Sequence, residues 1–195
     1  MKKSIQTILV LLGAVWLLPV TATASNDQDA MFKKEFPSLY RQVTHELEIK
    51  SRVAQLYSAL LEASTAAEAF YSGHGRYPST VSELTGTVHD ANKFSWTIRR
   101  GGGQEPPLFR AVYRSDNRIE GVCSNREVKL LDETKQLQKS AGCNANRYNR
   151  DFVKHADLAT FRRYLRALGA SDPDSVNYQE VLNAYDQAVS KSCSR

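Results

Sequence analysis

Residue types that could catalyse a reaction are present in this chain, but their spacing matches no specific catalytic arrangement. The four histidines, His45, His74, His89 and His155, are scattered without the close spacing of metal ligands, so we expect no metal site. Cys123 and Cys143 are too far apart to form a C-x-x-C redox pair. These residues give no support to an exported enzyme or enzyme inhibitor.

Two short motifs resemble ligand-binding loops only in part. The run Gly101-Gly102-Gly103 lacks the lysine and the following helix of a phosphate-binding loop, so we interpret it as a flexible hairpin loop. Asp172 and Asp174 have the spacing of the first calcium ligands, but the glycine and the terminal glutamate of a calcium loop are absent. We therefore expect a capped turn there, and a non-enzymatic protein without a cofactor.

Two groups of arginines lie among aromatic residues and could bind phosphate groups. Arginine neutralises phosphate charge and aromatic rings stack on bases, so both groups are candidate contacts to nucleic acid or to an acidic surface. The alternative is that the arginines form a solvated face, because alternation places Trp96 on the same strand face as Phe94 and Ile98. The candidates are Arg99, Arg100, Arg110 and Arg114 in the first group and Arg162, Arg163 and Arg166 in the second.

The first residues have the pattern of a secretory signal peptide. Lys2 and Lys3 precede an apolar run from Ile8 to Leu18, which is shorter than the roughly 20 residues of a membrane span. The small residues 22–24 predict cleavage after Ala24, and an uncleaved anchor is the alternative. Cleavage lowers the formal charge from +5 to +3, because it removes two lysines and no acid. We expect an exported protein, periplasmic or extracellular, with no stable membrane span after cleavage.

An exported chain with three cysteines is expected to form a disulfide. A Cys123–Cys143 bond would close a loop of about 20 residues and contribute about 3 kcal/mol on the chain-entropy model. Cys193 would then remain as an inert thiol, or as a thiol for an intermolecular bridge. Pairing of Cys193 with Cys123 or with Cys143 is the remaining alternative.

An apolar stripe predicts one long amphipathic helix in the first half of the chain. Seven residues recur at alternating intervals of four and three, which places them on one face of an α-helix. They are Ile49, Val53, Leu56, Leu60, Ala63, Ala67 and Phe70. Weaker spacing extends the predicted helix from about Ser38 to Tyr71, and Gly73 and Gly75 favour its end. A helix of this length requires a sheet or other helices along its apolar face.

The segments after this helix predict an α+β fold. Residues 93–99 alternate between apolar and polar, and residues 108–114 and 118–123 read as two further strands between turns. Residues 128–131 suggest a brief fourth strand. We expect an antiparallel meander of three to four strands that packs on the long helix, followed by a C-terminal helical hairpin. The predicted parts are a signal peptide (1–24), a flexible leader (25–37), an α+β domain (38–147) and the hairpin (148–195).

The end of the predicted helix carries a recognisable motif. The segment from Ala66 to Ser79 has an aromatic pair on the helix and then the turn Gly75-Arg76-Tyr77-Pro78. In this order of helix, turn and strands, the segment from Phe36 to Cys143 resembles the type IV pilin and type II secretion pseudopilin families. The resemblance implies an antiparallel sheet on the helix, and Cys123 and Cys143 resemble the pair that closes the C-terminal loop of many pilins.

The chain also departs from the pilin pattern. Pilins have a short basic leader, a glycine at the cleavage point and a Phe-Thr-Leu-x-Glu start to about 20 apolar residues, and none of these is present. The expectation is a soluble pilin-like protein in pilus or secretion-system assembly, adhesion or surface interaction, with pilus or secretion proteins as partners. The alternative is a DNA-binding component of an uptake or conjugation apparatus.

Overall fold

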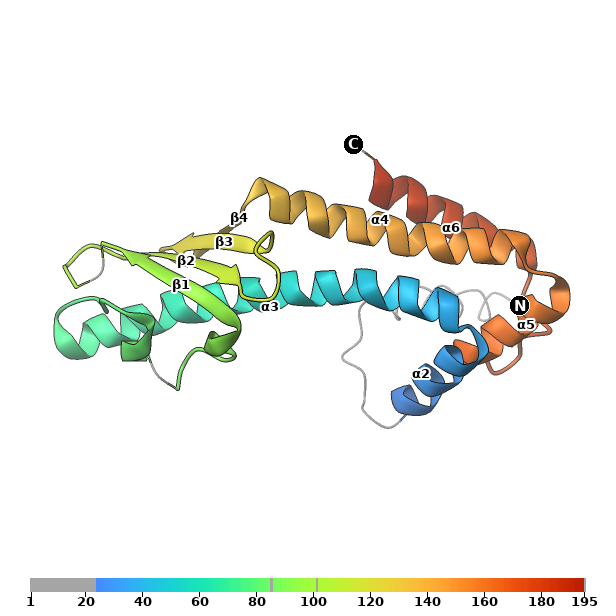
Figure 1. Ribbon diagram of the computed structural model, residues 1–195, viewed down its shortest axis with the longest axis horizontal. Coiled ribbons are helices and arrows are strands. Elements are labelled where there is room, and N and C mark those ends of the chain that lie inside the picture. Colours follow the sequence, from blue (N-terminus) through green and yellow to red (C-terminus); the bar gives the residue numbers. More distant parts are fainter. Residues whose placement is uncertain (1–23, 85, 101, 195) are drawn as a thin grey trace. The chain divides into compact units, whose positions relative to one another are not determined.

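The computed structural model describes residues 24–84, 86–100 and 102–194 (Figure 1). The predicted signal peptide therefore lies outside the described residues, except for Ala24. The chain divides into two compact units. The helical unit contains the described residues up to Glu46 and from Gly142 onward, and the helix–sheet unit is Leu47–Ala141. In the described part of the chain, no helix is both long enough and apolar enough to cross a membrane.

Helix α2, Ala24–Glu35, replaces the predicted flexible leader. The prediction was wrong because this segment has too few apolar residues to show a period, and its contacts come from elsewhere in the chain. Phe32 lies 5.9 Å from Tyr164, measured between ring centroids, and α2 packs against α5, Leu158–Ala167. Tertiary contacts of this kind stabilise helices whose own sequence pattern is weak.

Helix α3, Pro37–His74, is the long helix that the apolar stripe predicts. Phe36 separates it from α2, and Pro37 occupies its first position, where a missing N–H leaves no helical hydrogen bond unmade. Helix α3 contributes its residues up to 46 to the helical unit and the rest to the helix–sheet unit. In the helix–sheet unit the stripe is buried, with Val53, Leu56 and Leu60 almost completely inaccessible to solvent.

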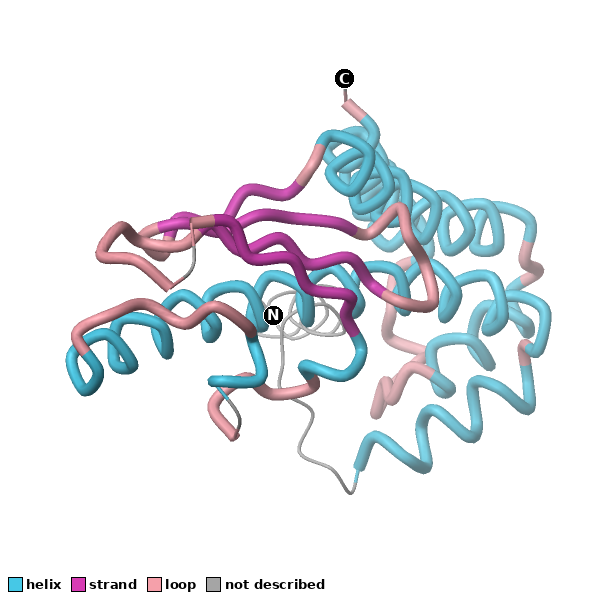
Figure 2. Tube along the Cα trace, turned by 60° about the vertical axis from the view of Figure 1, so that its left-hand side comes forward, coloured by secondary structure: helices cyan, strands magenta, loops and turns pink. Residues whose placement is uncertain are grey.

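Four strands form one antiparallel meander in the order β1-β2-β3-β4, as predicted. They are β1 (Phe94–Arg99), β2 (Leu108–Tyr113), β3 (Glu120–Ser124) and β4 (Glu127–Leu130). Figure 2 shows the strands side by side with α3 along one face of the sheet. Strands β1 and β4 are the two edges of the sheet. This is an α+β arrangement of a long helix packed on an antiparallel sheet.

The core of the helix–sheet unit lies between α3 and the inner face of the sheet. Phe94, Phe109 and Cys123 project from three successive strands and are fully buried. At Gly121 a Cβ atom would lie 2.9 Å from Leu60 Cδ1 and 3.2 Å from the Lys129 carbonyl oxygen. Glycine is therefore required here, because α3 and the sheet approach each other closely.

The C-terminal part is helical, as predicted, and a further long helix precedes the two helices of the expected hairpin. These helices are α4 (Asp132–His155), α5 and α6 (Tyr178–Cys193). Helix α4 continues through Gly142. A glycine inside a helix costs about 1 kcal/mol, and burial of the flanking Ala141, Cys143 and Ala145 offsets this cost.

The disulfide is Cys143–Cys193, so the predicted pairing of Cys123 with Cys143 was wrong. Cys143 lies in the interior of α4 and Cys193 ends α6, with their Cα atoms 4.9 Å apart. Cys123 faces the core of the helix–sheet unit as a free thiol. A spacing argument could not decide the pairing, because proximity in space depends on how α4 and α6 pack. The Cys143–Cys193 bond is consistent with a location outside the cytoplasm.

Candidate interaction site

The turn that follows α3 is fixed by its own local contacts. Gly75 has a φ of 68°, the left-handed conformation that glycine adopts at helix ends. Its N–H donates to the Tyr71 carbonyl oxygen at 2.9 Å. Tyr77 stacks on Tyr71 with ring centroids 4.5 Å apart, and Pro78 is fully buried. Gly75, Arg76, Tyr77 and Pro78, singled out from the sequence, therefore form one ordered structure.

Glu83 holds the other side of this turn. Its carboxylate forms an ion pair with Arg76, with Nη2 and Oε1 2.7 Å apart, and it accepts hydrogen bonds from the N–H groups of Ser79 and Thr80. The Arg76 guanidinium and the two N–H groups lower the pKa of Glu83 to about 2. The carboxylate is therefore charged at neutral pH and caps the short helix η1, Val81–Leu84.

The turn is also tied to the loop between β1 and β2. The Tyr77 N–H donates to the Gly103 carbonyl oxygen at 2.9 Å, and the Gly102 N–H donates back to the Tyr77 carbonyl oxygen at 3.1 Å. Gly102 has a φ of 83°, and a Cβ atom there would lie 2.7 Å from Ser79 Oγ. These glycines therefore have a structural role, which the sequence did not indicate beyond a flexible loop.

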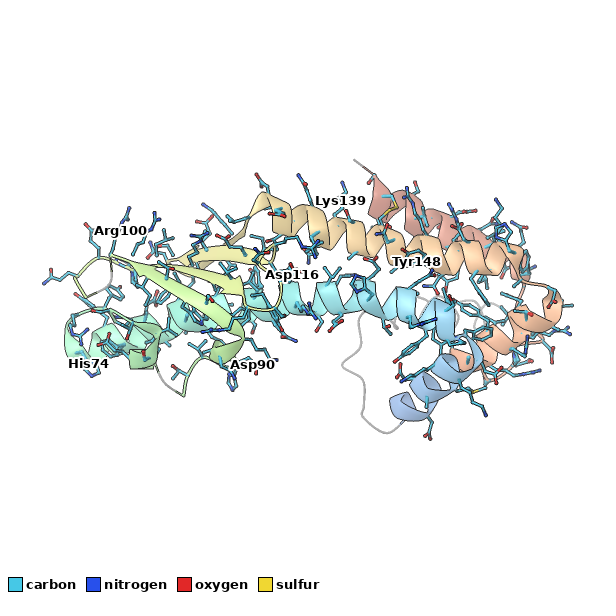
Figure 3. All side chains as sticks on the ribbon, viewed as in Figure 1. His74, Asp90, Arg100, Asp116, Lys139 and Tyr148 are labelled. Atoms are coloured by element: carbon cyan, nitrogen blue, oxygen red, sulfur yellow. A yellow bond between two sulfur atoms is a disulfide. The ribbon has the colours of Figure 1, made fainter. Side chains whose placement is uncertain are left out.

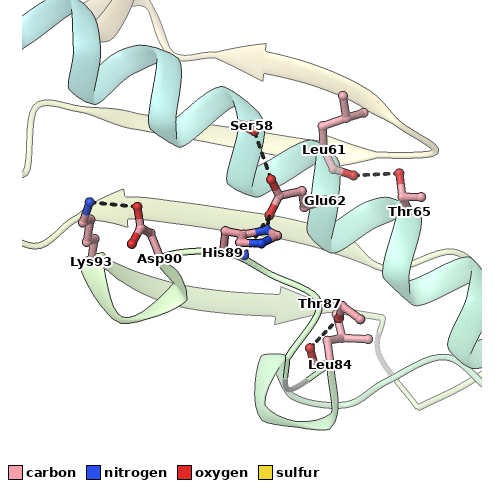
Figure 4. A network of polar contacts seen from close by, with 9 residues as sticks. All are labelled: Ser58, Leu61, Glu62, Thr65, Leu84, Thr87, His89, Asp90 and Lys93. Atoms are coloured by element: carbon pink, nitrogen blue, oxygen red, sulfur yellow. Dashed lines mark hydrogen bonds and ion pairs between the residues drawn. The ribbon is translucent and has the colours of Figure 1, made fainter. Parts of the chain in front are cut away.

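The segment between the turn and β1 is attached to α3 by polar contacts (Figure 4). Glu62 of α3 accepts hydrogen bonds from the His89 N–H at 2.8 Å and from Ser58 Oγ at 3.1 Å. Lys93 Nζ pairs with Asp90 Oδ2 at 2.8 Å. Because Glu62 holds this segment to α3 and Lys93 pairs with Asp90 within it, residues 86–93 form an ordered wall beside the sheet.

A pocket of about 560 Å³ lies between this wall and the edge strand β1. Among the described residues that line it, Arg114 is the one charged side chain, and there is no carboxylate. Trp96 and Ile98 contribute apolar surface from β1. The indole N–H of Trp96 donates to the Ala91 carbonyl oxygen at 2.9 Å, which fixes the ring between the wall and the sheet. The other lining residues are Ser79, Thr80, Val81, Ser82, Leu84, Gly86, Val88, Ala91 and Asn92.

The first predicted group of arginines is partly brought together at β1. Arg99 and Arg100 are exposed at the end of β1, and Arg100 is labelled there in Figure 3. Arg114 donates from Nε to the Phe94 carbonyl oxygen at 3.0 Å, at the other end of the strand. Arg110 points to the outer face of the sheet and pairs with Glu120. Within the described ranges, Arg99, Arg100 and Arg114 form no ion pair.

The second group lies on α5 in the helical unit, where two of its three arginines have acidic partners. Arg162 Nε pairs with Asp174 Oδ1 at 2.7 Å, and Arg163 Nη1 lies 4.0 Å from Glu35 Oε2. Arg166 is exposed. Asp174, which resembled a calcium ligand in the sequence, therefore serves as an ion-pair partner. No group of three or more His, Cys, Asp or Glu side chains that could hold a metal occurs within the described ranges.

A buried polar chain in the helical unit had no signal in the sequence. The Tyr164 hydroxyl donates to Asn149 Oδ1 at 3.0 Å and lies 2.6 Å from the Tyr185 hydroxyl. Burial raises the pKa of both tyrosines. Asn149 is itself bonded to the Ala145 carbonyl oxygen. The groups satisfy one another and open to no described pocket, so we interpret this chain as structural.

Burial also makes Cys123 a poor nucleophile. Its side chain is fully buried, and desolvation raises the pKa of the thiol, although hydrogen bonds from Ser64 and the Arg126 N–H lower it in part.

The sequence missed the pocket beside β1, because it is formed by segments that are separate in the sequence. The one feature of the sequence that could have indicated this pocket was the alternation of the apolar residues Trp96 and Ile98 along β1.

Comparison with known proteins gives no relative. No family model matches the chain, and no curated protein and no solved structure is similar to it. The candidate site is therefore interpreted from its own geometry. That geometry combines an ordered turn, an apolar pocket and an edge strand with unpaired arginines near both ends.

Proposed function

We propose that this chain is an exported, non-enzymatic protein with a pilin-like helix–sheet unit, and that it binds other proteins during pilus or secretion-system assembly or at the cell surface. The observation that carries the proposal is the packing of α3 on a four-stranded antiparallel meander, with the Gly75-Arg76-Tyr77-Pro78 turn between the helix and the sheet in the sequence. The order and type of these elements match the pattern that the sequence motif implied.

The contacts of the turn add support. Tyr77 and Pro78 pack inward, and the Tyr77 backbone is bonded to the loop between β1 and β2. The turn therefore positions the first hairpin of the sheet over α3. A role of this kind would explain why the turn motif occurs together with the helix and the sheet in this order.

The chemistry of the site also favours binding over catalysis. The pocket is lined by apolar and small polar side chains, and its one charged residue among those described is an arginine that donates a hydrogen bond to the backbone. The described residues of the pocket include no nucleophile with an adjacent base, and the free thiol of Cys123 is buried in the core instead. Such a surface suits recognition of a partner.

Binding to DNA in an uptake or conjugation apparatus has weaker support. Arg110, Arg162 and Arg163 have acidic partners, which lowers the positive charge that they offer to phosphates. Absence of detectable DNA binding at low salt would exclude this alternative.

The proposal is tested by capture of partners from the envelope of the source cells. The purified full chain, immobilised through a C-terminal tag, is expected to retain pilus or secretion-system components from the solubilised envelope fraction. An unrelated exported protein of similar net charge serves as the control bait. Recovery of no such component, or equal recovery on the control, would contradict the proposed role.

A further inference from the structure

Strand β1 has a free backbone edge beside the pocket. The Arg114 N–H donates to the Lys93 carbonyl oxygen at 2.9 Å, so Lys93 and Arg114 form a hydrogen-bonded pair of the β1–β2 ladder. In an antiparallel ladder such pairs alternate with pairs whose backbone groups point away from each other. The register pairs Trp96 with Ala111 and Ile98 with Phe109. The N–H and C=O groups of Trp96 and Ile98 therefore point away from β2, toward the free edge.

These four backbone groups have no partner among the described residues. The N–H of Phe94 bonds to the Ala91 carbonyl oxygen, and its C=O accepts from Arg114, so the free edge starts after Phe94. From there to Arg99, β1 offers alternating donors and acceptors. An edge of this type can be extended by another strand, which supplies the missing hydrogen bonds.

The pocket lies where the side chains of an added strand would project. Trp96 and Ile98 point to the inner face of the sheet and line the pocket. Side chains on an added strand alternate in the same way, so every second side chain would enter the pocket. Its lining by Val81, Leu84 and Val88 favours apolar side chains at those positions.

The charges near the free edge of β1 indicate which charges an added strand should carry. Arg114 lies near the start of β1, and Arg99 and Arg100 lie at its end. The nearby carboxylates of Asp90 and Glu83 are already paired with Lys93 and Arg76. An added strand would therefore meet positive charge at both ends, and acidic flanking residues would be complementary to it.

We propose that the free edge of β1 binds an extended segment of a partner protein, with apolar residues at alternate positions and acidic residues at both ends. The inference rests on the proposed protein-binding function and names its site and the chemistry of the partner. A second copy of this chain is a poor occupant, because two β1 edges would bring the same arginines together and like charges repel.

Amide hydrogen exchange of the full chain tests the proposal directly. The probe is the synthetic peptide Glu-Glu-Val-Thr-Val-Thr-Val-Glu-Glu, and the matched control peptide has lysine in place of every glutamate. We expect the glutamate peptide to slow exchange of the Trp96 and Ile98 amides at least about tenfold at saturation. The Ser95 and Thr97 amides point toward β2 and are expected to change little. Unchanged exchange at Trp96 and Ile98, or equal protection by the lysine peptide, would overturn the proposal.

A charge-reversal variant tests the role of the arginines. The double substitution Arg99→Glu and Arg100→Glu changes exposed side chains and is expected to weaken binding of the glutamate peptide about tenfold or more. Arg166→Glu, on the exposed surface of α5, is a control for charge reversal outside the site and is expected to leave binding unchanged. Equal loss in both variants would show that net charge alone attracts the peptide, which contradicts the proposed site.

The same variants separate this inference from the proposed function. If the double variant still captures pilus or secretion components while the peptide gives no protection, the β1 proposal is wrong and the proposed function stands. If the peptide protects β1 but the envelope yields no such component, the assembly role is wrong and the binding edge stands. Low-salt DNA binding that the double variant abolishes, with no peptide protection, would assign the arginines to nucleic acid and overturn the β1 proposal.

Discussion

The two units of this protein contain different kinds of buried contacts. The helix–sheet unit has an apolar core in which Leu56, Leu60, Phe94 and Phe109 are fully buried between α3 and the sheet. The helical unit buries hydroxyl and amide groups along with its aromatic rings, and it contains the disulfide. Both units bury apolar side chains, and the helical unit adds a covalent link and a buried chain of hydrogen bonds.

The lengths of the elements explain the difference. In the helix–sheet unit one long helix meets four strands, so a continuous apolar surface is available. In the helical unit α5 has ten residues, which is below the length of about 12–15 residues at which isolated helices become stable in water. A short helix needs fixed partners: Tyr164 of α5 is bonded to Asn149 of α4 and Tyr185 of α6, and the disulfide joins α4 to α6. Changes to the disulfide, to the tyrosine pair and to Glu83 test this contrast.

Removal of the disulfide should destabilise the helical unit most strongly. The bond joins residues with a sequence separation of 50, and the chain-entropy model gives about 4 kcal/mol for a loop of that length. We expect Cys193→Ser to lower the free energy of unfolding by an amount of this order, measured by hydrogen exchange of amides in α5 and α6. The amides of β2 and β3 should change much less.

Two controls make this test specific. A reducing agent should reproduce the effect in the wild-type chain and have no further effect on Cys193→Ser. Cys123→Ala keeps the disulfide, so its α5 and α6 amides should remain sensitive to the reducing agent. Equal destabilisation of both units by reduction would refute the contrast between them.

Substitution of Tyr185 tests the buried polar chain. Tyr185→Phe removes one hydroxyl and leaves the Tyr164 bond to Asn149 in place, so we expect a loss of about 1 kcal/mol in stability. Burial raises the pKa of Tyr185 above its ordinary value of 10.0. Above pH 10 the unfolded chain therefore loses this proton while the folded chain keeps it, and stability falls as the pH rises.

The Tyr185→Phe variant should therefore lose less stability than the wild type above pH 10. Urea unfolding of the helical unit at a series of alkaline pH values, followed through α5 and α6, measures the slope of the unfolding free energy against pH. Tyr57→Phe, a change at an exposed tyrosine of α3, is the matched control and should keep the wild-type slope. An unchanged slope in Tyr185→Phe would show that the buried pair does not control this titration.

The smallest effect is expected at the surface of the helix–sheet unit. The folded-state pKa of Glu83 is lowered from 4.5 to about 2, so its contribution to stability is present above pH 4.5 and is lost as the pH falls toward 2. Glu83→Gln should make the acid decline of this unit shallower over that range. Hydrogen exchange of the β1 and β2 amides at several acidic pH values measures this decline in stability. Substitution of the exposed Glu105, Glu105→Gln, is the control. An identical dependence of stability on acidic pH in wild type and Glu83→Gln would contradict the contribution assigned to Glu83.

Several features of the fold were predictable because they depend on local periodicity. The alternating spacing of Val53, Leu56 and Leu60 places them on one helix face wherever the helix packs, and α3 has nearly the predicted bounds. The alternation of Phe94, Trp96 and Ile98 likewise predicts the inner face of β1, and the structure confirms it. The turn at Gly75 was predictable because Gly73 and Gly75 can adopt the left-handed conformation and Pro78 restricts the residue before it.

Features that join separate segments were not predictable in the same way. Helix α2 was missed because its stability comes from contacts such as the one between Phe32 and Tyr164. The pocket was missed because the wall of residues 86–93 is held beside β1 by Glu62, which lies on another element. Half of the candidate site, the turn and the arginines at β1, was visible in the sequence.

Residue spacing along the chain was enough to predict the long helix, the meander and the turn between them, since each follows from residues close together in the chain. Tertiary structure alone decided that Cys143 pairs with Cys193 and that Cys123 is buried as a free thiol. It also decided which backbone edge of the sheet remains free beside a pocket. The physical reason is the same in each case: these properties depend on distances between distant residues, and residue spacing along the chain does not fix those distances.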